Sequence, residues 1–446
     1  AFGYAALGDN TTGSQNVAVG HNALNASSTG DSNTAFGYFA LKVNTTGDQN
    51  VAVGGNALDA NTTGVGNVAI GYEALTTSDT ADYNTALGFY SLRENTGSQN
   101  AGVGFRSLRY NTTGSNNSAL GYNCLVTNTT GSNNTAVGRE ALDSNTTASS
   151  NTAIGSAALG ANTTGYRNTV VGSQAGDAIT TGYQNTYMGY VAGSSHTTAN
   201  GNTGIGYGAL YSNTTASSNT AVGSQALEAN TTGSHNVAVG ATALDANTTG
   251  DNNVAVSNGL TANTTGSQNI SIGTSSLIAN TTGSNNTAIG HNAGYGASVK
   301  GNVSGDNNTF IGNNSVGTST TASNVITLGN GSISTLRCQV TSITTLSDER
   351  DKKDIFNLTA GLDFLNKLRP VSFTWNTRDK AKVDIKENGF IAQELVAVQK
   401  ETGITIPNLI NADNPDKLEA AYGTLIPVLV NAIKELSAKV KALEAG

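Results

Sequence analysis

One pattern of apolar and polar positions recurs about nineteen times over residues 1–330. The pattern is Asn-x-Ala-φ-Gly-x-x-Ala-Leu-x-x-Asn-Thr-Thr-Gly, where φ is an apolar residue. Its first glycine returns every 17 residues from Gly3 to Gly240, with a single spacing of 16, and the register continues past Ser257 to Gly312. A repeat of this regularity predicts a solenoid in which each repeat forms one rung that stacks on the next.

Alternation inside the repeat predicts the elements of a rung. In the repeat at 67–71, Val68 and Ile70 fall on one face of a short strand, and Ala69 and Gly71 fall on the other. We predict a second short strand at 73–75 and tight corners at the Asn-Thr-Thr-Gly segments, where Gly and Asn tolerate positive φ. Val, Ile and Leu are expected to fill a thin core, and stacked Asn residues such as Asn134, Asn151, Asn168 and Asn185 to form amide ladders.

The predicted core of each rung is narrow, which favours the association of several chains. A rung of 17 residues has a core only one or two side chains wide, which gives a single chain little buried surface. Small residues such as Ala69 and Gly71 would let the backbones of neighbouring chains approach closely. The pattern therefore predicts several chains packed around one axis.

The phrase Asn-Val-Ala-Ile-Gly at 67–71 resembles the head repeats of trimeric autotransporter adhesins. This resemblance covers about residues 1–330 and implies parallel β-rolls arranged in a homotrimer.

The 17-residue repeat ends at about residue 330, and the sequence pattern changes there. We predict a strand-like connector at 331–346, and then a helix at about 361–368, a strand at 371–375, a charged hairpin to Glu387 and a strand-to-helix passage at 389–395. A final helix from about Gly423 carries apolar residues at alternating spacings of four and three: Leu429, Ile433, Leu436, Val440 and Leu443. Such a heptad seam fits an oligomerising coiled coil, and the alternative is one amphipathic helix that packs on its own domain.

Composition and charge separate the same two parts and exclude several function classes. Residues 346–446 hold 29 of the 52 charged residues, all four prolines and the only tryptophan, as an ordinary compact domain would. The net charge of −8 argues against nucleic-acid binding, and no apolar run approaches the ~20 residues of a membrane span. Because the chain begins in mid-repeat, we expect a further segment upstream.

No metal or cofactor site is predicted. Cys124 and Cys338 lie far apart and are interpreted as two independent thiols. The four histidines share no metal-ligand spacing and are predicted to face solvent: His21, His196, His235 and His291.

Three recurring features of the repeats have a structural and a functional interpretation. The Asn-Thr-Thr triplets match the N-glycosylation pattern, but their constant turn position favours corner residues. Aromatic residues follow the repeat glycine, and ring-on-ring packing is favoured over a carbohydrate- or surface-binding stripe; they are Tyr72, Phe89, Phe105, Tyr122, Tyr190 and Tyr207. Asp59, Asp143 and Asp245 follow leucines and are interpreted as surface charge rather than as the paired carboxylates of a polysaccharide-cleaving enzyme.

The last hundred residues resemble, motif by motif, the endosialidase-type intramolecular chaperone, a self-cleaving C-terminal domain of phage tail spikes and tail fibres. The motifs are Ser347-Asp348-x-Arg350-x-Lys352-x-x-Ile355, 362–368 with Arg369-Pro370, Phe373-x-Trp375, Gly389-Phe390-Ile391-Ala392-Gln393-Glu394, and Tyr422 with the helix at 432–436. The resemblance implies a domain at 347–446 that trimerises, sets the register of three chains and is then cut off at the Leu346–Ser347 bond.

The cleavage chemistry can also be argued from the residue types. Residues 347–446 contain no His and no Cys, so activation of a hydroxyl by an amine is the available route. Lys352 would act as the base, in its neutral form, and the Ser347 hydroxyl would attack the preceding carbonyl in an N-to-O acyl shift. Asp348, Arg350 and Glu394 are candidate supporting residues. The alternative is that Ser347 and Asp348 only cap a helix at 349–353.

The sequence thus predicts a mainly β protein: a parallel β-roll or β-solenoid shaft in a homotrimer, followed by a small α+β chaperone domain with a C-terminal coiled-coil helix. The predicted function is an extracellular fibre, a phage tail fibre of the virion that attaches to a host cell-surface receptor, for which polysaccharide is one option. The alternative is a bacterial surface adhesin or appendage that keeps the domain. Any enzyme activity would act once, on the chain itself.

Overall fold

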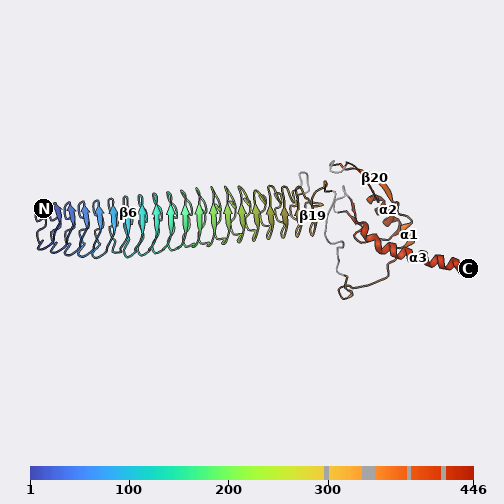
Figure 1. The fold of residues 1–446 in the computed structure, drawn as a ribbon, viewed down its shortest axis with the longest axis horizontal. Coiled ribbons are helices and arrows are strands. Elements are labelled where there is room, and N and C mark those ends of the chain that lie inside the picture. Colours follow the sequence, from blue (N-terminus) through green and yellow to red (C-terminus); the bar gives the residue numbers. More distant parts are fainter. Residues whose placement is uncertain (296–300, 334–346, 379–382, 413–417, 446) are drawn as a thin grey trace.

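The computed structural model describes residues 1–295, 301–333, 347–378, 383–412 and 418–445. Within these ranges, one parallel sheet of 19 strands runs the length of a straight shaft, and a small region of helices and hairpins follows it (Figure 1). The predicted mainly β architecture, a parallel solenoid followed by a small α+β region, is confirmed.

Each rung contributes one strand of three residues. The strands are β1 (Val17–Val19), β2 (Thr34–Phe36), β3 (Val51–Val53), β4 (Val68–Ile70), β5 (Thr85–Leu87), β6 (Ala101–Val103), β7 (Ser118–Leu120), β8 (Thr135–Val137), β9 (Thr152–Ile154), β10 (Thr169–Val171), β11 (Thr186–Met188), β12 (Thr203–Ile205), β13 (Thr220–Val222), β14 (Val237–Val239), β15 (Val254–Val256), β16 (Ile270–Ile272), β17 (Thr287–Ile289), β18 (Thr309–Ile311) and β19 (Ile326–Leu328).

Asparagine residues connect the rungs through their side chains, as predicted. The backbone N–H of Asn151 donates to Oδ1 of Asn134 at 3.0 Å, and Nδ2 of Asn151 donates to the carbonyl of Gly165 at 2.9 Å. The same bond from backbone N–H to Oδ1 repeats at Asn168 and Asn185, and all four side chains are buried. Each ladder amide thus satisfies a buried backbone N–H of the next rung, which would be costly to leave unpaired.

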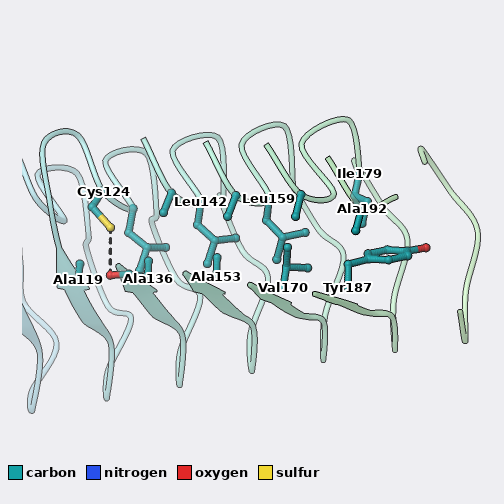
Figure 2. Close-up of a cluster of buried hydrophobic side chains, with 14 of the residues drawn as sticks. Ala119, Cys124, Ala136, Leu142, Ala153, Leu159, Val170, Ile179, Tyr187 and Ala192 are labelled. Carbon is teal, nitrogen blue, oxygen red and sulfur yellow. Dashed lines mark hydrogen bonds between the residues drawn. The ribbon is translucent and has the colours of Figure 1, made fainter. Parts of the chain in front are cut away.

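The orientation of the strands is the reverse of the prediction. Ala69 is completely buried, whereas Val68 is half-buried and Ile70 remains 38% exposed. The opposite arm of each rung lies so close to the strand that the core accommodates an alanine from the strand and a leucine from the arm, as Figure 2 shows for Ala136 and Leu142. Alternation correctly separated the two faces, but the small face points inward and the larger apolar face points outward.

The second predicted strand is also wrong, because residues 73–75 form turns. Glu73 and Leu75 adopt left-handed backbone conformations with φ of 49° and 55°. A non-glycine residue in this conformation costs roughly 1 kcal/mol, and the complete burial of the Leu75 side chain offsets that cost. The alternation at 73–75 therefore reflects an arm that points one leucine into the core, not a strand.

The corners and the aromatic residues agree with the structural interpretations. Asn61 is buried, and its Nδ2 donates to the Gly64 carbonyl at 3.1 Å and to Oδ1 of Asn44 at 2.8 Å, so this amide is unavailable to a glycan. Tyr72, Phe89, Phe105 and Tyr122 stack one on the next, with ring centroids 5.3–5.7 Å apart. Because neighbouring rings cover one another's faces, the stack stabilises the rungs.

One of the four histidines does not face solvent. His196 is completely buried, whereas His21, His235 and His291 are exposed as predicted. Its Nε2 donates to the Ala199 carbonyl at 2.7 Å, so its Nδ1 accepts the hydrogen bond from the buried Tyr187 hydroxyl. His196 stands where most rungs have the first asparagine of the Asn-Thr-Thr corner, and the hydrogen bond to Tyr187 gives this polar ring a partner inside the core.

Acid is expected to destabilise the shaft through His196. Burial lowers the pKa of this imidazole to about 4, compared with an ordinary value of 6.5. The neutral form therefore stabilises the folded state above pH 6.5, and up to about 3 kcal/mol of that stability is lost as the pH falls through 4. The denaturant midpoint should fall less between pH 7.5 and pH 4 for His196→Asn than for the unsubstituted chain. The control substitution His235→Asn should leave the fall in midpoint between the two pH values as it is in the unsubstituted chain. Equal pH profiles for the unsubstituted chain and both variants would contradict this role of His196.

The C-terminal region contains short helices and two hairpins around a core of its own. Its elements are η1 (Glu349–Asp351), α1 (Leu362–Leu365), β20 (Val371–Asn376), β21 (Val383–Gly389), α2 (Ala392–Thr402), β22 (Ile410–Asn411), β23 (Glu419–Ala420), η2 (Tyr422–Leu425) and α3 (Ile426–Glu444). The predicted helix, strand, hairpin and strand-to-helix passage are confirmed. The core is formed by Phe364, Leu395, Leu409, Leu425, Val428 and their neighbours.

Helix α3 packs on this core with a face other than its heptad seam. Val428 and Ala432 are buried, whereas all five seam residues, from Leu429 to Leu443, are exposed. The last helix therefore packs on its own domain, as the alternative held, but through residues other than the seam. No helix within the described ranges, α3 included, combines the length and apolarity that crossing a membrane requires.

Candidate self-cleavage site

The structure brings Ser347 and Lys352 together. Nζ of Lys352 donates to Oγ of Ser347 at 2.8 Å. The short helix η1 creates this contact, because the Lys352 N–H bonds to the Glu349 carbonyl at 3.0 Å and turns the chain back on itself. A hydroxyl and an amine at this distance can exchange a proton directly. Both side chains are exposed, and Leu346, which carries the carbonyl that would be attacked, lies outside the described residues.

Asp348 and Arg350 shape the turn. The Asp348 carboxylate accepts the backbone N–H of Arg350 at 2.9 Å and also pairs with its guanidinium at 2.5 Å. The hydrogen bonds from Arg350 hold the pKa of Asp348 below its usual range. The capping role considered for this segment thus falls to Asp348, and the capped element is the 3₁₀ turn Glu349–Asp351 instead of a helix at 349–353. Capping leaves the Ser347 hydroxyl available for Lys352.

Glu394 has a different partner. It forms an ion pair with Arg369, whose Nε lies 3.1 Å from Oε2 of Glu394, and this hydrogen bonding lowers the pKa of the Glu394 carboxyl. The pair joins the start of α2 to the Arg369-Pro370 corner. The described contacts of Glu394 thus lie at this corner and do not involve Ser347 or Lys352.

Other motif residues contact each other across the domain. The Tyr422 hydroxyl donates to the Phe390 carbonyl at 3.0 Å and accepts the Phe390 N–H at 3.2 Å. A side chain at Gly389 would place its Cβ 2.9 Å from that hydroxyl, which explains the glycine. These contacts link the Gly-Phe-Ile-Ala-Gln-Glu segment to the beginning of the last helix.

Two residues of α3 anchor the segment that leads from the candidate site into the domain. Nδ2 of Asn431 donates to the carbonyls of Leu358 and Ala360 at 3.2 and 2.9 Å, and the Glu435 carboxylate accepts the N–H of Leu362 at 2.8 Å. Glu435 falls in a sequence motif that predicts no role for it, and no motif marks Asn431, because the partners of both residues lie more than 70 residues away in the chain.

The geometry can be compared with known proteins. Residues 347–404 match the family model of the chaperone of endosialidase. The matched range begins at Ser347 and contains Lys352, the Arg369–Glu394 pair and the Gly389 motif, so the predicted chaperone region is confirmed there. No curated protein and no solved structure matches the chain. The chain therefore combines a parallel β-solenoid with a chaperone domain of this family.

The rungs hold acidic residues that are not simple surface charges, in contrast to the prediction. Asp59, Asp143 and Asp245 are half-buried, and desolvation raises the pKa of each carboxyl, that of Asp59 to about 6. They lie in different rungs along the shaft. Among the described residues, no group of three or more His, Cys, Asp or Glu side chains could hold a metal ion.

Replacing Asp59 by Asn is expected to stabilise the shaft at neutral pH only. The pKa of this carboxyl is raised on folding, because burial favours the protonated form. The protonated Asp59 therefore makes its full contribution to the stability of the folded state below the unfolded pKa of 3.8, and this contribution is lost as the pH rises through about 6. Solvent screening of a half-buried group reduces the expected gain at pH 8 to about 1 kcal/mol. Denaturant midpoints at pH 8 and pH 3.5 test this, with exposed Asp9→Asn as the control; an equal gain at both values would contradict the titration.

Proposed function

We propose that this chain forms a homotrimeric extracellular fibre whose chaperone domain aligns three chains and then cuts itself off between Leu346 and Ser347. The observation that carries this proposal is the contact between Lys352 Nζ and Ser347 Oγ, which lies at the start of the family match. The most suitable role for such a fibre is a phage tail fibre of the virion that attaches to a host receptor such as a surface polysaccharide. A bacterial surface adhesin or appendage that retains the domain is the second candidate.

The proposed cleavage needs only groups of this chain and water. Neutral Lys352 takes the proton from the Ser347 hydroxyl, and Oγ attacks the carbonyl carbon of Leu346. The bond from that carbon to the Ser347 nitrogen breaks, the nitrogen takes the proton back, and an ester joins Leu346 to Oγ. Water hydrolyses the ester to a Leu346 carboxylate and a free Ser347 amino terminus. Because the exposed amine must first be neutral, we expect its final surroundings to form in the assembled trimer.

Two exposed apolar surfaces support a trimer. The first is the heptad seam of α3. The second is the outward face of the strands, where the third residue of every strand from Val19 to Leu328 is Val, Ile, Leu, Met or Phe and none is buried. At ~4.7 Å per strand, this stripe is about 85 Å long, far larger than the scattered apolar residues of a monomer. The stripe replaces the inward Ala and Gly face as the surface proposed to contact neighbouring chains.

A removable chaperone suits a shaft of near-identical rungs. The strands can pair at many offsets that differ by whole rungs, so three chains need a common starting point. A trimerising C-terminus supplies that starting point, and its removal after assembly leaves a shaft that is held by its barrier to unfolding.

The proposal is tested by intact-mass analysis of the purified chain and of three variants. The unsubstituted chain should yield a C-terminal fragment that begins at Ser347, and both Ser347→Ala and Lys352→Ala should remain uncut. Lys353→Ala is the matched control, since it removes the neighbouring amine and should still cleave. An uncut unsubstituted chain would refute self-cleavage and favour a retained cap on a surface appendage.

A further inference from the structure

The hairpin of β20 and β21 lies over a large groove. The groove has a volume of about 1110 Å³. Aromatic and aliphatic side chains line much of it: Phe373, Trp375, Phe390, Ile391, Leu418 and Tyr422. Most of these residues belong to the motifs of the chaperone region. Two of them, Tyr422 and Phe390, are joined by the hydrogen bonds described above.

Strand β21 of the hairpin is largely left uncovered by the described residues. Six of the seven residues of β21 are exposed, among them Val383 and Ile385. A two-stranded hairpin is marginally stable in water unless another layer covers one of its faces. The groove beneath β20 is therefore a surface that needs an occupant.

Among the large exposed apolar side chains of the described residues in 347–445, one group belongs neither to a helix nor to the hairpin or the groove. Seven of them lie on α3, where three copies can pair along the seam, and Ile391 and Tyr422 already line the groove. Val383 and Ile385 belong to the hairpin, and Val396 lies alone on α2. The others lie within four residues of one another: Ile355, Phe356 and Leu358, of which Phe356 is 84% exposed. We call residues 355–358 the arm.

We propose that the arm of each chain docks in the groove of a neighbouring copy, an inference that rests on the proposed homotrimer. Asn431 holds the base of the arm on α3 through the carbonyls of Leu358 and Ala360. Figure 1 shows the segment before α1 leaving α3 on the side away from β20. In this view the backbone of the arm lies on the other side of α3 from β20, and a second copy of the chain supplies a groove of the right chemistry.

This docking makes cleavage depend on assembly. The arm begins three residues after Lys352, and residues 349–359 are all exposed in the single chain. Insertion of Phe356 into a neighbouring groove would fix the chain on one side of η1, while the shaft fixes it on the other. Ser347 and Lys352 would then be held in place only after the copies have come together, so that a chain is not cut before its register is set.

Disulfide trapping between differently tagged chains tests the contact. One chain carries Phe356→Cys and the other Ile391→Cys, both with Cys338→Ser and Ser347→Ala so that the domain stays attached. Cys124 is buried, and burial raises the pKa of its thiol to about 12, so it remains in place. We expect at least tenfold more crosslinked heterodimer than with Val396→Cys, an equally exposed position on α2 outside the groove.

The outcomes separate this inference from the proposed trimer. A trimer by light scattering without the crosslink overturns arm exchange and leaves the fibre proposal intact. A crosslink found only when both cysteines are in one chain means that the arm occupies its own groove, which also overturns the exchange. A monomeric full-length chain overturns both proposals.

Cleavage kinetics test the coupling. In the otherwise unsubstituted chain, Phe356→Ala should slow the appearance of the Ser347 fragment at least tenfold while the trimer persists through α3. Val396→Ala should cleave at the original rate. Cleavage of Phe356→Ala trimers at the original rate would show that docking does not control the reaction.

Discussion

Replacing Gly155 by alanine is expected to break the shaft at its rung. Gly155 has a φ of 140°, which side-chain-bearing residues rarely adopt, and a Cβ there would collide with the Gly172 carbonyl of the next rung. The N–H groups of Gly155 and Gly172 each bond to a carbonyl of the preceding rung at 2.8 Å, so the two backbones cannot separate without losing these bonds, and the cost should exceed about 4 kcal/mol. Limited proteolysis should reveal a new cut near residue 155, together with a large fall in the denaturant midpoint.

The matched control is Gly55→Ala, at the glycine that directly follows the repeat glycine Gly54. Gly55 does not have positive φ, and its Cβ would come no closer than 3.4 Å to the ring of Tyr72. This substitution should change the stability by less than about 0.5 kcal/mol. If Gly155→Ala were equally harmless, the repeat glycine would have to be explained by something other than the close approach of rungs.

The period of the repeats, their parallel register and the asparagine ladder could all be predicted from the sequence, because each follows from identical residues at a constant spacing. Which face of the strand turns inward could not. That choice depends on the distance between the strand and the opposite arm, which leaves room for Ala69 but not for Ile70. The arm was mistaken for a strand because Leu75 points inward through a left-handed turn that alternation does not reveal.

In the C-terminal region, the order of motifs predicted Ser347 and Lys352 as the candidate pair, and a single turn brings their side chains into contact. Partners that come from distant segments were harder to predict. Nothing in the spacing indicates that Glu394 pairs with Arg369, or that Asn431 holds Leu358. Those pairs depend on how α2 and α3 pack, so residue type alone left the role of Glu394 open.

The rungs also differ in ways that fix their order. Tyr187 occupies a position that is alanine in most rungs, and glycines replace the leucine and the alanine that would surround it. A Cβ on Gly193 would lie 2.6 Å from the Tyr187 ring, and one on Gly204 would lie 2.8 Å from it. A slip by one rung would press this ring against a larger residue and leave a void at the glycines. Such matched sets specify which rungs stack on one another within a chain, whereas the proposed role of the C-terminal domain is to align three chains.

Tyr187→Ala is expected to destabilise the shaft by about 3–5 kcal/mol, because it leaves a cavity between two glycines and removes the hydrogen bond to His196. Adding Gly193→Leu, Gly204→Ala and His196→Asn to this variant recreates the common rung and should restore most of the lost stability. The denaturant midpoint of the full-length chain measures both effects.

The sharpest form of this prediction is a change of sign. Gly204→Ala should destabilise the unsubstituted chain by about 1–3 kcal/mol through overpacking against Tyr187, and should stabilise the Tyr187→Ala variant because it fills part of the void. A double-mutant cycle isolates this coupling, since the two residues are in contact. If Gly204→Ala had the same effect in both backgrounds, the glycine would not be matched to the tyrosine, and this pair would not specify which rungs stack.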